Sequence, residues 1–140
     1  MKNLRSMFLA LTVLLLATAA HAQQTNVKAD VPFDFVVGDR AYSAGEYTVK
    51  SMADSGVAIR IDNTQDSERG ITLSNACNSL QPAPGTKLVF QRLGDHYFLY
   101  QVWTQGNSIG REFPVSKAEV QIAKNFGKPE LVIVAANISH

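Results

Sequence analysis

Apolar and polar side chains alternate with a period of two along residues 27–37. The odd positions hold Val27, Ala29, Val31, Phe33, Phe35 and Val37, and the even positions hold Lys28, Asp30, Pro32 and Asp34. This alternation predicts a strand with one buried face and with its carboxylates in solvent. Pro32 cannot donate a hydrogen bond to a neighbouring strand, which favours an edge strand in a sandwich or an incompletely closed barrel.

Three more strands are predicted before residue 75. The segment Tyr42–Glu46 reads as a tight hairpin turn with Gly45 at a position that requires positive φ, and a strand then continues to Ser51. Residues 57–62 alternate in the same way, and Ile71–Ser74 begins the next strand after a polar loop. The spacing of strands and turns is typical of a sandwich or a small barrel.

The strongest local pattern is a hairpin made of residues 86–93 and 96–103 around Gly94-Asp95. Glycine in the first position suits a two-residue type II′ turn, which pairs Leu93 with His96. Continued without a break, this register pairs Leu88 with Gln101. Both faces of the hairpin are then apolar. The second face carries a candidate interaction surface consisting of Val89, Phe98, Tyr100 and Val102. A helix or another sheet is expected to cover it, unless a ligand or a partner does.

A helix is predicted to follow the hairpin. Ser116 and Glu119 have the spacing of a capping box, and the apolar residues that follow recur at intervals of three and four. The helix is expected to span Lys117–Phe126 and to end at Gly127 as a left-handed cap. We expect this helix to cover the second face of the hairpin. The apolar run Leu131–Ala136 then predicts a central or well-covered strand.

These elements define one fold class. We predict an all-β domain at residues 23–140, with one C-terminal helix and about seven or eight mostly antiparallel strands. The expected architecture is a β-sandwich or an incompletely closed meander barrel.

The first 22 residues have the three parts of a secretory signal peptide. Lys2 and Arg5 form a positive start, Phe8–Ala20 is apolar, and Ala20-His21-Ala22 is a small-x-small cleavage site. The apolar run is 13 residues long, whereas a membrane-spanning helix needs roughly 20. We therefore expect cleavage after Ala22 and a soluble product in the periplasm or outside the cell, with no membrane insertion after cleavage.

Charge and cysteine content narrow the expected function further. After removal of residues 1–22, 11 basic and 12 acidic residues remain, a formal charge of −1. A near-neutral chain lacks the basic surface that nucleic-acid binding needs, so no nucleic-acid partner is expected. Cys77 is the single cysteine and cannot form an internal disulfide.

The segments "VPFDFVVGD" and "AGEYTV" carry a resemblance. Together with the signal peptide they resemble a group of small exported bacterial proteins of unknown function, in which a "VPF-F-VG" strand precedes a "PAG-Y-V" turn and strand. Ser43 stands where that group often has proline. The resemblance implies export and architecture, and it carries no catalytic residues to this chain.

Motifs for catalysis or cofactor binding are not found in the sequence. GxSxG, HExxH, P-loop and GxGxxG patterns are absent, and Cys77 has no CxxC partner. His96 begins the strand directly after the turn residue Asp95, and because successive strand residues point to opposite faces, the two side chains should diverge. We predict no catalytic residue, no cofactor and no metal ligand, and we interpret the protein as a non-enzyme.

Three functions are compatible with these observations. The first is a non-catalytic binding or structural module of the cell envelope, which contacts a protein or another envelope component. The second is a carrier of a small apolar ligand in a lipocalin-like barrel, suggested by layout alone. The third is an enzyme, for which the sequence offers the least.

Overall fold

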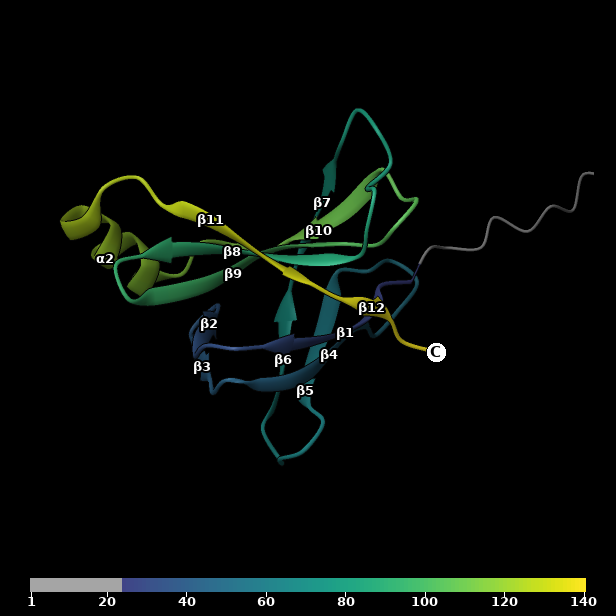
Figure 1. Ribbon diagram of the computed structural model, residues 1–140, viewed down its shortest axis with the longest axis horizontal. Helices are drawn as coiled ribbons and strands as arrows, with labels where there is room; N and C mark the ends of the chain where they lie inside the picture. Colours follow the sequence, from purple (N-terminus) through teal and green to yellow (C-terminus); the bar gives the residue numbers. More distant parts are fainter. Residues whose placement is uncertain (1–23) are drawn as a thin grey trace, which may run out of the picture.

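The computed structural model describes residues 24–140, so the predicted signal peptide at residues 1–22 lies outside the described residues. The described chain forms two β-sheets, and helix α2 (Lys117–Phe126) lies at one end of the molecule (Figure 1). The first sheet has the order β12–β1–β4–β5–β6, made of Asn137–Ile138, Asn26–Val31, Gly45–Ser51, Ala58–Asn63 and Arg69–Leu73. The second has the order β11–β8–β9–β10–β7, made of Glu130–Ala135, Lys87–Leu93, His96–Trp103, Ile109–Glu112 and Asn75–Asn78. The short strands β2 (Phe35–Val37) and β3 (Arg40–Tyr42) join the second sheet through β9.

The core lies between the two sheets: in Figure 1, strands β8, β9 and β11 of the second sheet lie above strands β1, β4 and β5 of the first. The first sheet contributes the buried side chains of Val27, Val49, Ile59 and Ile61, and the second contributes the buried side chains of Leu88, Phe90, Leu99 and Val102. Removing such a side chain from water stabilises the fold by about 1.5–3 kcal/mol. The predicted all-β sandwich with one C-terminal helix is confirmed.

The strand count differs from the prediction, because the chain passes from one sheet to the other within predicted strands. The expected strand over residues 27–37 ends at Val31 in the first sheet and resumes at Phe35 in the second. Pro32, which has no N–H to donate, lies at this crossing. Similar crossings at Ser74 and Ala136 separate β6 from β7 and β11 from β12. Twelve short strands result within residues 24–140, where seven or eight longer ones were expected.

The predicted turn at Gly45 is wrong. The tight hairpin lies earlier, where β2 and β3 pair Val37 with Arg40, and Gly38 between them has φ of 60°. Gly45 does not have positive φ; it begins β4, which pairs with β1 in the other sheet. The segment between β3 and β4 is therefore another crossing between sheets.

The hairpin of β8 and β9 has the predicted turn. Gly94 has φ of 61°, and no residue other than glycine has positive φ within residues 24–140, so Asp95 completes a type II′ turn. The predicted pairs hold as far as Phe90 with Leu99, but a bulge then shifts the register. Leu88 therefore pairs with Val102 and not with Gln101. One extra residue in β9, Tyr100, accounts for the shift.

Helix α2 has the predicted bounds and the predicted N-terminal cap. The hydroxyl oxygen of Ser116 accepts a hydrogen bond of 3.0 Å from the backbone N–H of Glu119. At the other end Gly127 has φ of 72° and ψ of −133°, so it has positive φ as predicted but lies outside the left-handed helical region. Among the described residues, no helix is long and apolar enough to pass through a bilayer.

Strand β11 is an edge strand, which corrects the prediction of a central one. Among the described strands it pairs with β8 alone, while Val132 and Val134 pack partly against the core. Leu131 and Ile133 point the other way, and 58% and 61% of their surfaces are exposed. The continuous apolar run predicts cover on both faces of the strand, but one face lies in solvent.

Candidate functional site

The bulge in β9 divides the predicted interaction surface between two faces of the second sheet. Val102 is 1% exposed and belongs to the core between the sheets, because it pairs with Leu88. Val89 and Phe98 lie on the outer face but are buried, and only Tyr100 is partly exposed. The four residues therefore do not form one accessible surface.

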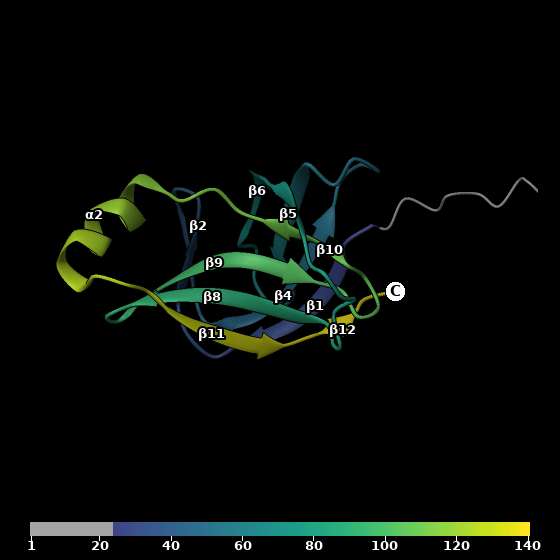
Figure 2. The ribbon, with the colours of Figure 1, turned by 90° about the horizontal axis from the view of Figure 1, so that it is seen from above.

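Helix α2 lies at the hairpin end of this outer face and contacts β8 (Figures 1 and 2). Its last residue, Phe126, covers Gly94: a Cβ atom built on Gly94 would lie 2.6 Å from the Phe126 ring. Burial raises the pKa of Tyr100, and nearby carboxylates including Glu112 and Glu119 raise it further. The helix thus covers part of the outer face, as the sequence predicted, and brings an acidic side chain to it.

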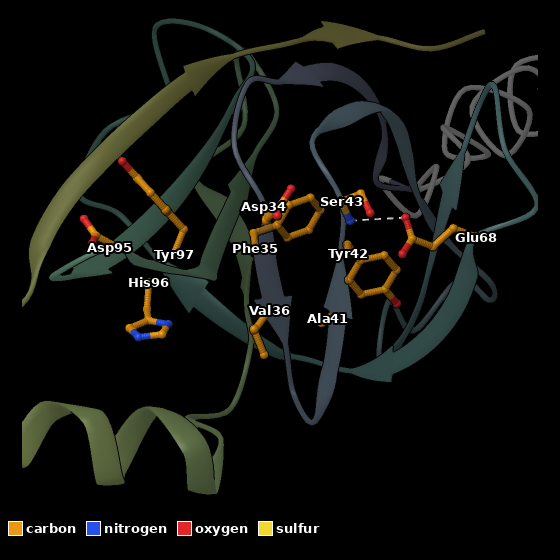
Figure 3. Close-up of a pocket in the computed structure, with 10 residues that line it drawn as sticks. All are labelled: Asp34, Phe35, Val36, Ala41, Tyr42, Ser43, Glu68, Asp95, His96 and Tyr97. Carbon is orange, nitrogen blue, oxygen red and sulfur yellow. Dashed lines mark hydrogen bonds between the residues drawn. The ribbon is translucent and has the colours of Figure 1, made fainter.

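An open groove of about 360 Å³ lies where the β2–β3 hairpin meets the start of β9 (Figure 3). The residues that line it are Asp34, Phe35, Val36, Ala41, Tyr42, Ser43, Glu68, Asp95, His96 and Tyr97. Four of them are acids or histidine, so we consider it as a catalytic site first.

The carboxylates on the β3 side of the groove are used to hold the fold. Asp34 accepts a 2.8 Å hydrogen bond from the backbone N–H of Ala44. Glu68 accepts one of 3.2 Å from the backbone N–H of Ser43 and one of 2.6 Å from the hydroxyl group of Tyr47. These bonds fix the crossing between β3 and β4 onto the loop before β6. Within residues 24–140, neither carboxylate is paired with a base.

Asp95 and His96 diverge at the other side of the groove. Figure 3 shows the His96 ring pointing toward the helix, while the Asp95 side chain points away from it. The His96 ring lies edge-on to the Phe126 ring, with 6.5 Å between centroids. This arrangement agrees with the expectation that adjacent strand residues face opposite ways. No group of three or more potential metal ligands occurs within residues 24–140.

Cys77 lies on β7 opposite Gly110 and is partly buried. Burial raises the pKa of its thiol, and the charge of Glu112 raises it further. Because the thiolate is the nucleophilic form, this environment does not activate the sulfur.

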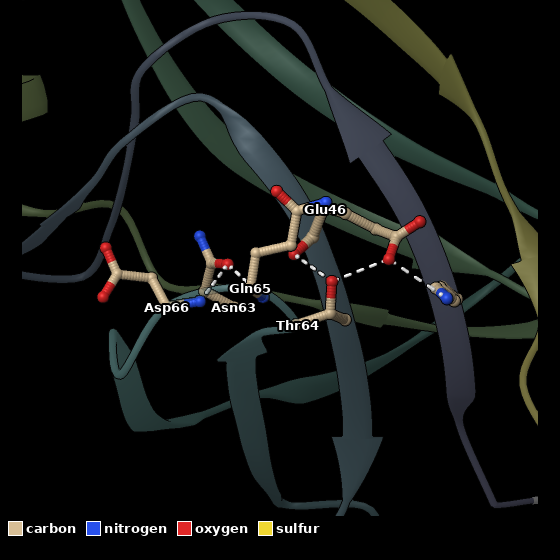
Figure 4. A network of polar contacts seen from close by, with 6 residues as sticks. Glu46, Asn63, Thr64, Gln65 and Asp66 are labelled. Carbon is tan, nitrogen blue, oxygen red and sulfur yellow. Dashed lines mark hydrogen bonds and ion pairs between the residues drawn. The ribbon is translucent and has the colours of Figure 1, made fainter.

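A second polar network lies at the same end of β4, around Glu46, which is the second residue of the strand (Figure 4). The Thr64 hydroxyl group donates to the Glu46 carboxylate at 2.6 Å, and Lys28 contacts the same carboxylate at 3.1 Å. Both contacts lower the pKa of Glu46, and the hydrogen bond from Thr64 has the larger effect. Asn63 accepts hydrogen bonds from the backbone N–H groups of Gln65 and Asp66 and so shapes the turn. The network consists of exposed side chains, and each of them bonds to a residue of a neighbouring strand or turn.

The accessible apolar surface next to the predicted face is on β11. Ile133 pairs with Val89 and Leu131 pairs with Gln91, so both exposed side chains continue the outer face of the second sheet. We call Leu131 and Ile133 the β11 strip. Sequence reasoning missed it because the strand was expected to be covered; a signal was available, since Glu130 and Lys128 flank the run with charges.

The comparisons with known proteins do not add a family. No family model matches the chain, and neither the curated proteins nor the solved structures include a significant match.

Proposed function

We propose that the mature chain is an exported, non-catalytic module that acts by contact with a protein or another component of the cell envelope. The observation that carries this proposal is the β11 strip. Two branched apolar side chains are more than half exposed on a strand that pairs on one edge only within the described residues. Such an edge can accept a further strand through its backbone while its side chains bind apolar groups.

Export is the second part of the proposal. It rests on the pattern of residues 1–22, with two basic residues, an apolar run of 13 residues and Ala20-His21-Ala22. N-terminal sequencing of protein recovered from the periplasm or the medium should give Gln23 as the first residue. An intact Met1 on exported protein, or retention in the cytoplasm, would refute this part.

The apolar-carrier alternative is supported less by the geometry. A lipocalin-like carrier needs an interior space for its ligand. Here aromatic rings fill the space between the sheets: Phe35 contacts Tyr47 and Phe90 edge to face, with centroids 5.1 and 5.4 Å apart. Phe33 adds a further edge contact to Phe90 at 4.9 Å. An apolar ligand would have to displace these rings.

Site-specific photo-crosslinking tests the contact function. A photoreactive side chain at Ile133 should give a discrete adduct in the producing cell, and Leu131→Glu in the same chain should abolish it. The matched control is the same side chain at Gln65, an exposed position on a polar turn. Equal adducts from both positions, or none from β11, would contradict the proposal. A small apolar molecule found by native mass spectrometry in the purified protein would favour the carrier.

A further inference from the structure

Arg111 is a buried arginine on the inward side of β10. It pairs with Val102, a core residue, and only 9% of its surface is exposed. Its Nε–H donates to the Ser74 hydroxyl oxygen at 2.9 Å, and its Nη2 donates to the Ser74 carbonyl oxygen at 2.7 Å. Ser74 is itself buried at the crossing from β6 to β7, where its hydroxyl group donates to the carbonyl oxygen of Gly56 at 2.9 Å.

Among the described residues, no carboxylate forms an ion pair with this guanidinium group. The ion pairs within residues 24–140 are Lys28 with Glu46 and Arg60 with Asp62, and neither includes Arg111. Residues 1–23 contain no Asp or Glu, so that stretch cannot supply a side-chain carboxylate either. A buried charge without a counter-charge costs free energy. The position therefore favours an anion that comes from outside the chain.

The guanidinium group still has one free edge. Its five N–H groups form two edges, and Ser74 occupies the edge made by Nε and Nη2. The other edge, made by Nη1 and Nη2, has no hydrogen-bond partner among the described residues. A planar carboxylate accepts two parallel hydrogen bonds from an edge of this kind.

A cavity of about 410 Å³ reaches this arginine. Gly56 lies over the guanidinium group, with its hypothetical Cβ 3.5 Å from Cζ and from Nη1, and its φ of 66° reserves the position for glycine. Asp54 and Ser55, which are exposed, and Asn107, which is partly exposed, also line the cavity and place polar groups toward its opening. The cavity thus has a basic floor and a polar mouth.

We propose that this cavity binds a carboxylate, with Arg111 as its bidentate anchor. A singly charged, planar group fits better than phosphate because Asp54 at the mouth repels a second negative charge. Ser55 and the Asn107 amide nitrogen can donate to the rest of the molecule. The carboxylate can belong to a free organic acid or to the C-terminus of a peptide, since both present the same group.

Nuclear magnetic resonance titration of ¹⁵N-labelled protein, produced with its own leader, tests the site. The probes are acetate, N-acetyl-alanyl-alanine and the C-terminal amide of that dipeptide. The first two should shift the Arg111 Nε–H and Gly56 N–H signals saturably, and the amide should not. Tighter binding of the dipeptide than of acetate identifies a peptide terminus as the source, and equal binding identifies a free acid.

Matched variants decide whether Arg111 is responsible. Arg111→Gln should lose saturable binding, whereas Arg60→Gln, which removes an exposed arginine already paired with Asp62, should retain it. Asp54→Asn changes only an exposed side chain and should tighten binding about three- to tenfold, so the proposal is testable even where Arg111→Gln does not fold. No saturable shift up to about 100 mM probe, a hundredfold above a Kd of about 1 mM, would overturn the proposal. Binding of sulfate or phosphate in preference to acetate would overturn the assignment to carboxylates.

Discussion

The hydroxyl oxygen of Tyr47 lies 2.6 Å from a carboxylate oxygen of Glu68 and 2.6 Å from the carbonyl oxygen of Ser43. A phenol has one proton, so it donates to one of these acceptors at a time. Burial, and then the hydrogen bond to Glu68, raise the pKa of Tyr47 to about 12. The contact joins β4 to the loop before β6 and fixes one wall of the groove.

Replacing Tyr47 with Phe should lower the free energy of unfolding by about 1–3 kcal/mol, because the hydrogen bond from the phenol to its part-buried acceptors is lost while the ring remains. Urea denaturation measures the change. Tyr97→Phe is the control, since the Tyr97 ring stacks on Phe33 with 3.8 Å between centroids and that contact is kept. An equal loss in both variants would contradict a specific role for the Tyr47 hydroxyl group.

The raised pKa of Tyr47 also predicts the behaviour of the protein in alkali. Between about pH 10 and 12 the unfolded chain releases the phenol proton while the folded chain keeps it. Stability should therefore fall as pH rises through this window. Tyr47→Phe should fall less steeply over the same range. Absorbance at 295 nm should show one tyrosine that ionises near pH 12.

Gly94 and Phe126 should be energetically coupled. Alanine at Gly94 introduces a Cβ at positive φ and places it 2.6 Å from the Phe126 ring. Gly106 also has positive φ, 79°, but its hypothetical Cβ meets nothing within 4 Å. Gly106→Ala should lower the free energy of unfolding only by the cost of placing alanine at positive φ, about 1–2 kcal/mol. Gly94→Ala should lower it by more. In the double variant with Phe126→Ala, the extra destabilisation caused by Gly94→Ala should become smaller, because the ring that its Cβ meets is gone. Thermal unfolding measures this, and a double variant whose loss of stability equals the sum of the two single losses would exclude the coupling.

Phe98 should stabilise the outer face of the second sheet. The side chain is 3% exposed, so Phe98→Ala should lower the free energy of unfolding by about 3–5 kcal/mol. Phe126→Ala removes a ring that is 53% exposed and should cost clearly less. If Phe98→Ala left stability intact and abolished capture of a ligand or partner, the face would be a binding surface.

Glu119 should make stability depend on pH in the acidic range. Burial raises the pKa of this carboxyl group above its ordinary value of 4.5, against the opposing effect of the Ser116 backbone. From pH 4.5 to the raised pKa, the unfolded chain ionises first, so stability falls as pH rises. Glu119→Gln should remove this slope and leave stability at pH 4 little changed. Urea denaturation at several pH values measures this dependence, and Glu130→Gln, at an exposed position, is the control. Parallel pH profiles of stability for wild type and Glu119→Gln would refute the role of Glu119.

Local signals in the sequence predicted local structure well. The bounds of α2 follow from Ser116, Glu119 and Gly127, which act within one or two turns of their own positions. The type II′ turn follows from Gly94 for the same reason. Each of these features needs only the chemistry of neighbouring residues.

Features set by distant segments were not predictable in the same way. The bulge at Tyr100 coincides with the point where β10 joins β9, with Arg111 opposite Val102. The alternation of apolar and polar residues does not indicate which strand will lie beside β9, so the pattern predicts Val102 on the outer face, although this side chain lies in the core. The edge position of β11 and the burial of Arg111 likewise depend on which strands become neighbours, and a single chain's periodicity does not encode that.

The pairing of β1 with β12 has a consequence for biosynthesis. Val27 pairs with Ile138, so the first and last strands of the described chain lie side by side. During translation the earliest of these segments emerges long before its partner exists. Contacts of such high sequence separation form late and slowly. The edge of the first strand that pairs with β12 should therefore stay open until residues 137–138 have been synthesised, which leaves that edge accessible to chaperones.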